Sequence, residues 1–331
     1  MRGDDGRTSS LGLTGNRIGL GLAALGRPGY INIGHGSDIG DDRSVEAMEA
    51  AAHNVLDAAY DAGVRYYDAA RSYGLAERFL ASWIAKRELS TRDITVASKW
   101  GYTYTANWRV DAETHEVKNH VLPVLVRQFA ESRALLGDNL KVYQIHSATI
   151  ESGVLRDVAV IDELARMRDN GLLIGLSVSG PQQAETIMRA LDVRRGHERV
   201  FASVQATWNV LERGATDALM AAHDAGVRVV VKEALANGRL AERGVEREPE
   251  LAVLRDEARR VGTTPDVLAL TFVLAQPWAD FVLSGAATVS QLESNVFAAM
   301  LKILPDSAER LAALAVSSTE YWRARSALAW N

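Results

Sequence analysis

The chain of 331 residues contains no cysteine, and nowhere does it hold an uninterrupted apolar run of 18 residues. Without thiols it can form no disulfide, no thiolate metal site and no thiol nucleophile. The missing apolar runs argue against a membrane span, and the polar start MRGDDGRTSS lacks the apolar core of a signal peptide. We expect a soluble cytoplasmic protein whose first residues, 1–14, form a flexible terminus or a short hairpin.

Surplus positive charge is also absent, because 37 Lys and Arg face 42 Asp and Glu, a formal net charge of −5. Such a chain offers no basic field to nucleic acid, so the expected partner is a small molecule, with self-association left open. The seven histidines show no H-E-x-x-H or comparable spacing, and no metal is predicted. The apolar share of 47% is typical of a globular protein with a sizeable core.

Short β-rich apolar runs alternate with segments of helical periodicity, such as the stripe that follows a predicted helix cap at Ser44. Strands that alternate with helices indicate parallel strands joined by helical crossovers, and eight such units close a barrel. We therefore predict a single-domain α/β protein, a (β/α)8 TIM barrel over residues 15–305, with a C-terminal helix and tail, 306–331, packed on it. The predicted strands are residues 17–22, 64–69, 94–100, 141–147, 174–179, 201–207, 228–234 and 281–286.

The competing architecture is an open doubly wound sheet, favoured by GLGLAA at residues 19–24, which fits the dinucleotide-binding pattern G-x-G-x-x-A. That pattern is meaningful only where a helix follows directly, because the helix N-terminus receives the pyrophosphate. Here the chain continues LGRPGYINIGHGSDIGDD, whose Gly and Pro content opposes a helix. The barrel is therefore preferred.

In such a barrel the reactive groups gather at the carboxyl ends of the strands. Asp68, Lys99 and His146 end three successive predicted strands, and Tyr73 follows Asp68 in the next loop. A lysine beside a tyrosine stabilises the phenolate, and an aspartate keeps the lysine charged and oriented. With a histidine to hydrogen-bond a substrate oxygen, this set can deliver a proton to a carbonyl oxygen while another group attacks the carbon.

These residues lie in motifs that resemble those of the aldo-keto reductases, a barrel family that passes hydride between a nicotinamide cofactor and a carbonyl or alcohol. The matching segments cover roughly residues 15–300 in the family's order. DAARSYGLAE fits the family pattern D-x-A-x-x-Y-G-x-S-E except at Ala76. The other matches are ITVASKW, ESRALLGDNLKVYQIHS, GLSVS, SVQATWN and SGAATVSQLESN.

The resemblance implies roles for particular residues. Tyr73 becomes the general acid and base, tuned by Lys99 and Asp68, while His146 orients the substrate oxygen. Trp208 becomes a ring beside the nicotinamide, although core packing explains a tryptophan equally well. The full set of implied cofactor-binding residues is Gly21, Ser177, Gln205, Trp208, Leu235, Gly285, Ala286, Gln291 and Asn295.

The sequence departs from the family pattern at several of these places. Val178 replaces an expected asparagine, and Lys232 with Glu233 replaces a small polar pair, so that Lys232 meets either the cofactor pyrophosphate or Glu233. The family implies NADP(H), yet residues 281–301 contain no Lys or Arg for its 2′-phosphate, which leaves NAD(H) open. Arg239 is a candidate to supply that charge from another loop.

The substrate pocket is less readable. The long polar loop 26–43 follows the first strand on the active rim, and we expect its Tyr30 to line the pocket together with Trp100. The amphipathic end YWRARSALAWN covers the mouth, contacts a neighbouring subunit or forms a solvated helix end. The sequence does not specify the substrate.

Three functions follow from these observations. The first is a nicotinamide-dependent reductase of aldehydes or ketones, or the reverse reaction, including the oxidation of sugar lactols. The second is an aldolase or lyase in which Lys99 forms a Schiff base, against which Asp68 argues because a carboxylate keeps the amine protonated. The third is a catalytically weak regulatory protein that keeps the nicotinamide site as a sensor.

Overall fold

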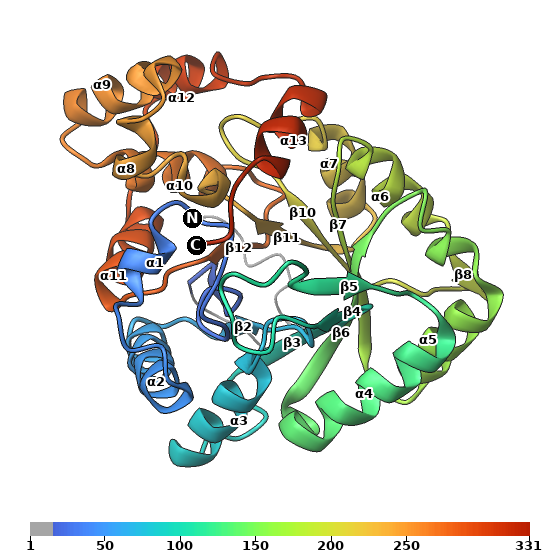
Figure 1. Ribbon diagram of the computed structural model, residues 1–331. Coiled ribbons are helices and arrows are strands. Elements are labelled where there is room, and N and C mark those ends of the chain that lie inside the picture. The colour runs from blue at the N-terminus through green and yellow to red at the C-terminus, as the bar shows by residue number, and fades with distance from the viewer. Residues whose placement is uncertain (1–15) are drawn as a thin grey trace.

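The computed structural model describes residues 16–331, so the terminus or hairpin predicted within residues 1–14 lies outside the described part of the chain. Eight parallel strands close a barrel whose neighbours run β1-β2-β3-β6-β7-β10-β11-β12 and back to β1, as Figure 1 shows. The predicted TIM barrel is confirmed. Its strands are β1 Ile18–Gly21, β2 Tyr66–Asp68, β3 Thr95–Trp100, β6 Leu140–Ala148, β7 Leu173–Val178, β10 Ser203–Thr207, β11 Arg228–Lys232 and β12 Phe281–Ser284.

The strands form because both of their faces are buried, which explains their nearly continuous apolar sequences. One core fills the barrel itself, where the rings of Tyr66 and Phe281 stack with centroids 4.6 Å apart, beside Leu283. A larger core lies between the strands and the helices that surround them. The barrel interior is thus packed with side chains, so a ligand can bind only at an end of the barrel.

Most helices follow the predicted pattern, but the segment LGRPGYINIGHGSDIGDD, predicted to oppose a helix, contains the four-residue helix α1. Ser44 caps α2, because its Oγ accepts a hydrogen bond from the backbone N–H of Ala47 at 3.3 Å. The apolar stripe of α2, which includes Met48 and Val55, is buried against the barrel. The helices are α1 His35–Asp38, α2 Val45–Asp61, α3 Ala76–Lys86, α4 Leu122–Leu136, α5 Val158–Asp169, α6 Gln183–Leu191, α7 Thr216–Asp224, α8 Glu242–Val245, α9 Ala252–Arg260, α10 Pro265–Leu274, α11 Val289–Phe297, α12 Pro305–Ala312 and α13 Ser318–Ser326. No helix within residues 16–331 is both long enough and apolar enough to cross a membrane.

Two small antiparallel hairpins extend the predicted pattern. Strands β4 Tyr102–Tyr104 and β5 Glu116–Lys118 form one hairpin, and β8 Arg194–Arg195 pairs with β9 Glu198–Arg199 in the other. The strands of these hairpins are only two or three residues long. Alternation over so few residues is too short to predict a strand from the sequence.

The C-terminal segment folds back over the barrel end. After α13 the chain runs across the mouth to the loop that follows β1 (Figure 1), where the backbones of Tyr30 and Asn331 exchange two hydrogen bonds of 3.1 and 3.2 Å. The indole of Trp330 stacks on the ring of His115, with centroids 3.9 Å apart. The tail therefore covers the mouth of its own chain and fastens the loop 26–43.

A buried carboxylate joins the elements that carry the first motif. Glu77 of α3 accepts hydrogen bonds from the hydroxyls of Ser98 in β3, at 2.5 Å, and Ser132 in α4, at 2.6 Å. It also pairs with Arg71 in the loop after β2. Because Glu77 is only 2% exposed, this network fixes the position of the loop between Asp68 and α3.

Replacing Glu77 by Ala tests this anchor. The change removes the acceptor of two buried hydroxyls and one of the two carboxylates that pair with Arg71, which keeps Glu131 at 2.8 Å. The free energy of unfolding should therefore fall by about 2–4 kcal/mol. Urea denaturation monitored by tryptophan fluorescence measures the loss. The exposed Glu309→Ala serves as a control and should change stability by less than about 0.5 kcal/mol. Equal effects of the two substitutions would contradict the proposed anchoring role.

Candidate active site

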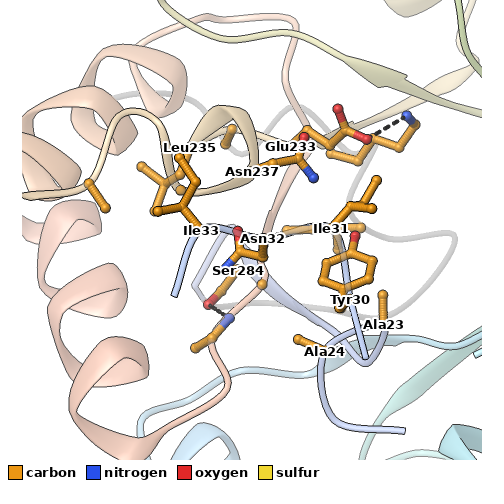
Figure 2. Close-up of a pocket in the computed structure, with 18 of the residues that line it drawn as sticks. Ala23, Ala24, Tyr30, Ile31, Asn32, Ile33, Glu233, Leu235, Asn237 and Ser284 are labelled. Carbon is orange, nitrogen blue, oxygen red and sulfur yellow. Dashed lines mark hydrogen bonds and ion pairs between the residues drawn. The ribbon is translucent and has the colours of Figure 1, made fainter. Parts of the chain in front are cut away.

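A cavity of about 1020 Å³ opens at the carboxyl ends of the strands. Figure 2 shows how it is built: Tyr30, Ile31, Asn32 and Ile33 of the loop after β1 face residues that follow β11, among them Glu233 and Leu235. Ser284 at the end of β12 also lines the cavity. Asp68, Tyr73 and His146 also line this cavity. The strand ends thus converge on one space large enough for a cofactor and a substrate.

Asp68 is held from three sides at the end of β2. Its Oδ2 accepts from the ammonium of Lys99 in β3, and its Oδ1 accepts from Gln144 Nε2 at 3.1 Å and from Gln205 Nε2 at 3.0 Å. The carboxylate is 2% exposed. An ammonium and two amide donors together fix its orientation.

Lys99 has no exposure to solvent, and its ammonium is directed by its neighbours. Besides Asp68, it donates to the carbonyl of Ala69 at 2.9 Å and to the hydroxyl of Tyr73 at 3.4 Å. The pairing of Lys99 with Tyr73 across 26 residues of sequence brings together the ammonium and the phenol that the strand-end pattern indicated. The cation therefore lies where charge appears when the phenol loses its proton.

Tyr73 is a protonated phenol in this arrangement. Burial raises its pKa well above the usual 10, the Asp68 carboxylate raises it further, and the Arg27 guanidinium opposes them. The sequence predicts that Lys99 lowers this pKa, but in the structure the pKa is raised, because Asp68 compensates the ammonium. Tyr73 therefore carries its proton at neutral pH and is able to donate it.

His146 on β6 completes the set. Its ring meets that of Tyr73 edge to face, with centroids 5.4 Å apart, and its Nδ1 lies 3.4 Å from the Ser72 hydroxyl. Burial lowers its pKa well below 6.5, and the charges of Lys99, Lys232 and others lower it further. The imidazole is thus neutral and has one N–H to offer a substrate oxygen.

Sequence reasoning missed Arg27, which is only 2% exposed. Its guanidinium donates to the Ser72 carbonyl and to Glu116 of β5, both at 2.9 Å. The guanidinium carbon lies 5.2 Å from the ring centroids of both Tyr30 and Tyr73. No local pattern marks this residue, because its carboxylate partner lies 89 residues away in a hairpin that periodicity did not predict.

Most of the implied cofactor-binding residues line the cavity. Asn295 of α11 donates to the Ser284 hydroxyl at 2.8 Å, and Gln291 donates to Asp38 of α1 at 2.8 Å. Asp38 also binds Arg243 of α8 at 2.8 Å, so three elements are joined across the groove. The cavity-lining members of the implied set are Gly21, Gln205, Leu235, Gly285, Ala286, Gln291 and Asn295.

These residues fit a nicotinamide dinucleotide. The helix α11 begins at the cavity, where Ser290 and Gln291 line it, and a helix N-terminus is suited to a phosphate. The amide oxygen of Asn237, a residue only 6% exposed, also lies at the cavity without a hydrogen-bond partner. Among residues 16–331 there is no group of three or more side chains arranged to hold a metal ion.

Besides Lys99, which has no exposed surface and is absent from the cavity wall, three expected site residues do not line the cavity. Trp100 has no exposed surface and packs edge-on against His120, because adjacent residues of a strand point to opposite faces and Lys99 takes the face toward Asp68. Trp208 is buried between Phe272 and Trp278.

The third of these residues is Ser177, whose hydroxyl accepts from the backbone N–H of Ser147 at 2.8 Å and is absent from the cavity wall. Val178, which stands in place of an expected asparagine, is fully buried. Tyr30, by contrast, lines the cavity as predicted.

The structure also shows what the unusual charged pair Lys232 and Glu233 contacts. Glu233 accepts two hydrogen bonds from Arg325 of α13, at 2.7 and 3.3 Å, and lies 3.7 Å from the ammonium of Lys232. Burial raises the pKa of Glu233, but Lys232 and Arg325 outweigh it and lower that pKa to about 2. Arg239, the cation proposed for a cofactor phosphate, is instead paired with Glu248.

Comparisons with known proteins agree with this geometry. A family model described as the aldo/keto reductase family matches residues 17–316. The chain is 25% identical over 276 residues to the uncharacterized oxidoreductase YqkF of Bacillus subtilis, covering 76% of this chain and 83% of that protein. It is also 25% identical over 330 residues to the aldo-keto reductase str7 of Strobilurus tenacellus, covering 90% and 88%.

A solved structure of similar fold is the holo form of the aldo-keto reductase AKR11C1 from Bacillus halodurans. It superposes with a TM-score of 0.71 at 22% identity, covering 92% of this chain and 94% of that one. The putative aldo-keto reductase PA4992 from Pseudomonas aeruginosa superposes with a TM-score of 0.61 at 21% identity, covering 88% and 92%.

The ion pair between Glu233 and Arg325 yields a pH prediction. Glu233→Gln should lower the free energy of unfolding by about 3 kcal/mol at pH 7, because Arg325 loses its buried partner. Since folding lowers the pKa of Glu233 from 4.5 to about 2, its contribution is complete above pH 4.5 and declines as pH falls toward 2. Urea titrations of both proteins at several pH values should show the gap narrowing below pH 4.5. A gap independent of pH would exclude this carboxylate as its source.

Proposed function

The chain belongs to the aldo/keto reductase family, and on that premise we propose that it is an oxidoreductase that transfers hydride between a nicotinamide cofactor and a small aldehyde, ketone or alcohol. The observation that carries the proposal is the alignment of Tyr73, Lys99 and Asp68 in one hydrogen-bonded chain at the cavity. This arrangement joins a proton donor to the cation that stabilises its conjugate base. His146 stands beside the same phenol.

The chemistry divides between the cofactor and the side chains. A bound reduced nicotinamide supplies hydride to the carbonyl carbon. Tyr73 donates its proton to the carbonyl oxygen as negative charge develops there, and the neutral His146 donates a hydrogen bond to the same oxygen. Lys99 stabilises the phenolate that remains, while Asp68 keeps Lys99 charged. In the oxidative direction the phenolate accepts the proton of the alcohol.

The other two functions receive less support. A Schiff base requires a neutral amine, whereas Lys99 is engaged by the Asp68 carboxylate and the Ala69 carbonyl. A sensor that only binds cofactor has no need of a buried proton donor aligned with a cation. The first observation disfavours an aldolase, and the second favours turnover over binding alone.

Tyr73→Phe is the direct test of the proposed acid. Reduction of a panel of aldehydes and ketones should fall by about 10²–10⁴-fold, because the variant lacks the transferable proton. Cofactor binding, followed by nicotinamide fluorescence, should stay unchanged. Tyr60→Phe, which removes a phenol outside the cavity wall, is the control and should retain full activity. Full activity of the Tyr73 variant would refute the assignment.

The cofactor is expected to be NAD(H) on the evidence of charge. The family implied NADP(H), but the cavity wall near α11 carries three carboxylates, those of Asp38, Glu242 and Asp266. The nearby guanidinium of Arg243 is already paired with Asp38. A 2′-phosphate placed at that end of the cavity would meet more like than opposite charge.

Parallel titrations with NADH and NADPH check this preference. We expect NADPH to bind about tenfold more weakly, a difference of about 1.4 kcal/mol. Glu242→Gln should bring the two dissociation constants closer, because it removes a carboxylate from the wall. The exposed Glu293→Gln on α11, which does not line the cavity, should leave the ratio unchanged. Equal or tighter NADPH binding by the unmodified protein would reverse the conclusion.

A further inference from the structure

The charges around the catalytic end of the cavity are not balanced. Three carboxylates there each have a close cationic partner: Asp68 pairs with Lys99, Glu116 with Arg27 at 2.9 Å, and Glu233 with Arg325 at 2.7 Å. Among the described residues of this part of the wall, Lys232 is the additional cation. The region therefore carries one more positive than negative charge.

The contacts of Lys232 are incomplete. Its ammonium makes one hydrogen bond, 2.8 Å to the Thr207 hydroxyl, while the nearest carboxylate oxygen, on Glu233, lies at 3.7 Å. Both oxygens of that carboxylate already accept from Arg325. An ammonium has three donors, so Lys232 retains hydrogen-bonding capacity although its side chain is only 16% exposed.

Burying the Lys232 ammonium without a further partner costs desolvation free energy. Burial lowers the pKa of Lys232 to about 8; Glu233 opposes this effect, whereas Arg325 and Lys99 add to it. A buried ammonium surrounded by two other cations and one shared carboxylate is the environment in which an incoming anion gains most. The indole of Trp322, whose centroid lies 5.7 Å from the ammonium, closes one side of this space.

The position of Lys232 relative to the proton donor is set by the barrel. Lys232 ends β11, which lies four strands from β3, the strand of Lys99, in either direction around the closed sheet. The ammonium thus faces the catalytic set from the opposite side of the mouth. Both sides line one continuous cavity. A molecule whose carbonyl reaches Tyr73 can extend its other end toward Lys232.

We propose that Lys232 binds a carboxylate carried by the carbonyl substrate, so that the preferred substrates are aldehydes or ketones with a carboxylate at a distance from the carbonyl. This inference rests on the proposed reductase function and specifies its substrate class. The ammonium neutralises the carboxylate, and Thr207 holds the ammonium in place. Neutral carbonyl compounds would still reach Tyr73 but would lack this contact.

Carboxybenzaldehydes test the proposal, because the 2-, 3- and 4-isomers place the carboxylate at different distances from the same carbonyl. The matched neutral probes are benzaldehyde and the methyl esters of the three acids. For at least one isomer we expect a KM about tenfold lower than that of its ester, the effect of one charge-assisted hydrogen bond. Lys232→Met should abolish the difference through KM, and Lys232→Arg should retain most of it.

Controls separate this role from others. Lys118→Met removes an exposed lysine of β5 that does not line the cavity, and it should leave the acid preference intact. Direct binding provides a readout other than turnover: 4-(hydroxymethyl)benzoate should quench the tryptophan fluorescence of the unmodified protein more strongly than of Lys232→Met. The dissociation constant of NADH should be the same for both proteins.

The dependence on pH adds a second signature. Because the pKa of Lys232 is lowered to about 8, the preference for acids should decline as pH rises through and beyond that value. Lys232→Arg should keep its preference, since a guanidinium stays charged.

The outcomes distinguish a failure of the proposed reductase function from a failure of the proposed role of Lys232. Absence of turnover with every carbonyl probe would defeat the proposed function itself. Reduction of neutral and acidic aldehydes with equal KM would overturn only the role of Lys232. A weaker affinity of Lys232→Met for NADH, with the acid preference intact, would instead place the ammonium at the cofactor and overturn the inference.

Discussion

The site depends on the buried ion pair between Asp68 and Lys99. Neither side chain is more than 2% exposed, so each charge alone would cost several kcal/mol to bury. The pair is sustained because its remaining hydrogen-bonding capacity is used: Gln144 and Gln205 donate to Asp68, and the Ala69 carbonyl accepts from Lys99. The ammonium is therefore held 3.4 Å from the hydroxyl of Tyr73.

This arrangement explains why the phenol is protonated in the free protein. Burial and the carboxylate of Asp68 both oppose ionisation of Tyr73, and the ammonium is compensated. In the proposed mechanism the cation therefore acts when the proton passes to a substrate, rather than by ionising the phenol beforehand. Electrostatic stabilisation aimed at a developing charge contributes more to rate than stabilisation of a resting one.

The mouth of the barrel is closed by segments that are distant in sequence. Arg27 links the loop after β1 to the hairpin strand β5 through Glu116, and its guanidinium lies 4.7 Å from the ring of Trp330 in the C-terminal tail. The tail is fastened in turn to Tyr30 and, through Arg325, to Glu233. The loop after β1, the hairpin strand β5 and the C-terminal segment therefore form one cover over the cavity.

The sequence by itself determined the barrel and the identity of the strand-end residues, because both follow from local information: apolar strands repeat along the chain, and polar residues stand at their carboxyl ends. Only the tertiary structure decided which face each neighbouring residue takes and which charges meet. Trp100 and Trp208 belong to the core. The pleat of the strand turns Trp100 to the face opposite Lys99, and Trp208 packs between buried aromatic rings. Arg27, Gln144 and the pairing of Glu233 with Arg325 depend on elements brought together by barrel closure, and no pattern along the chain encodes such contacts.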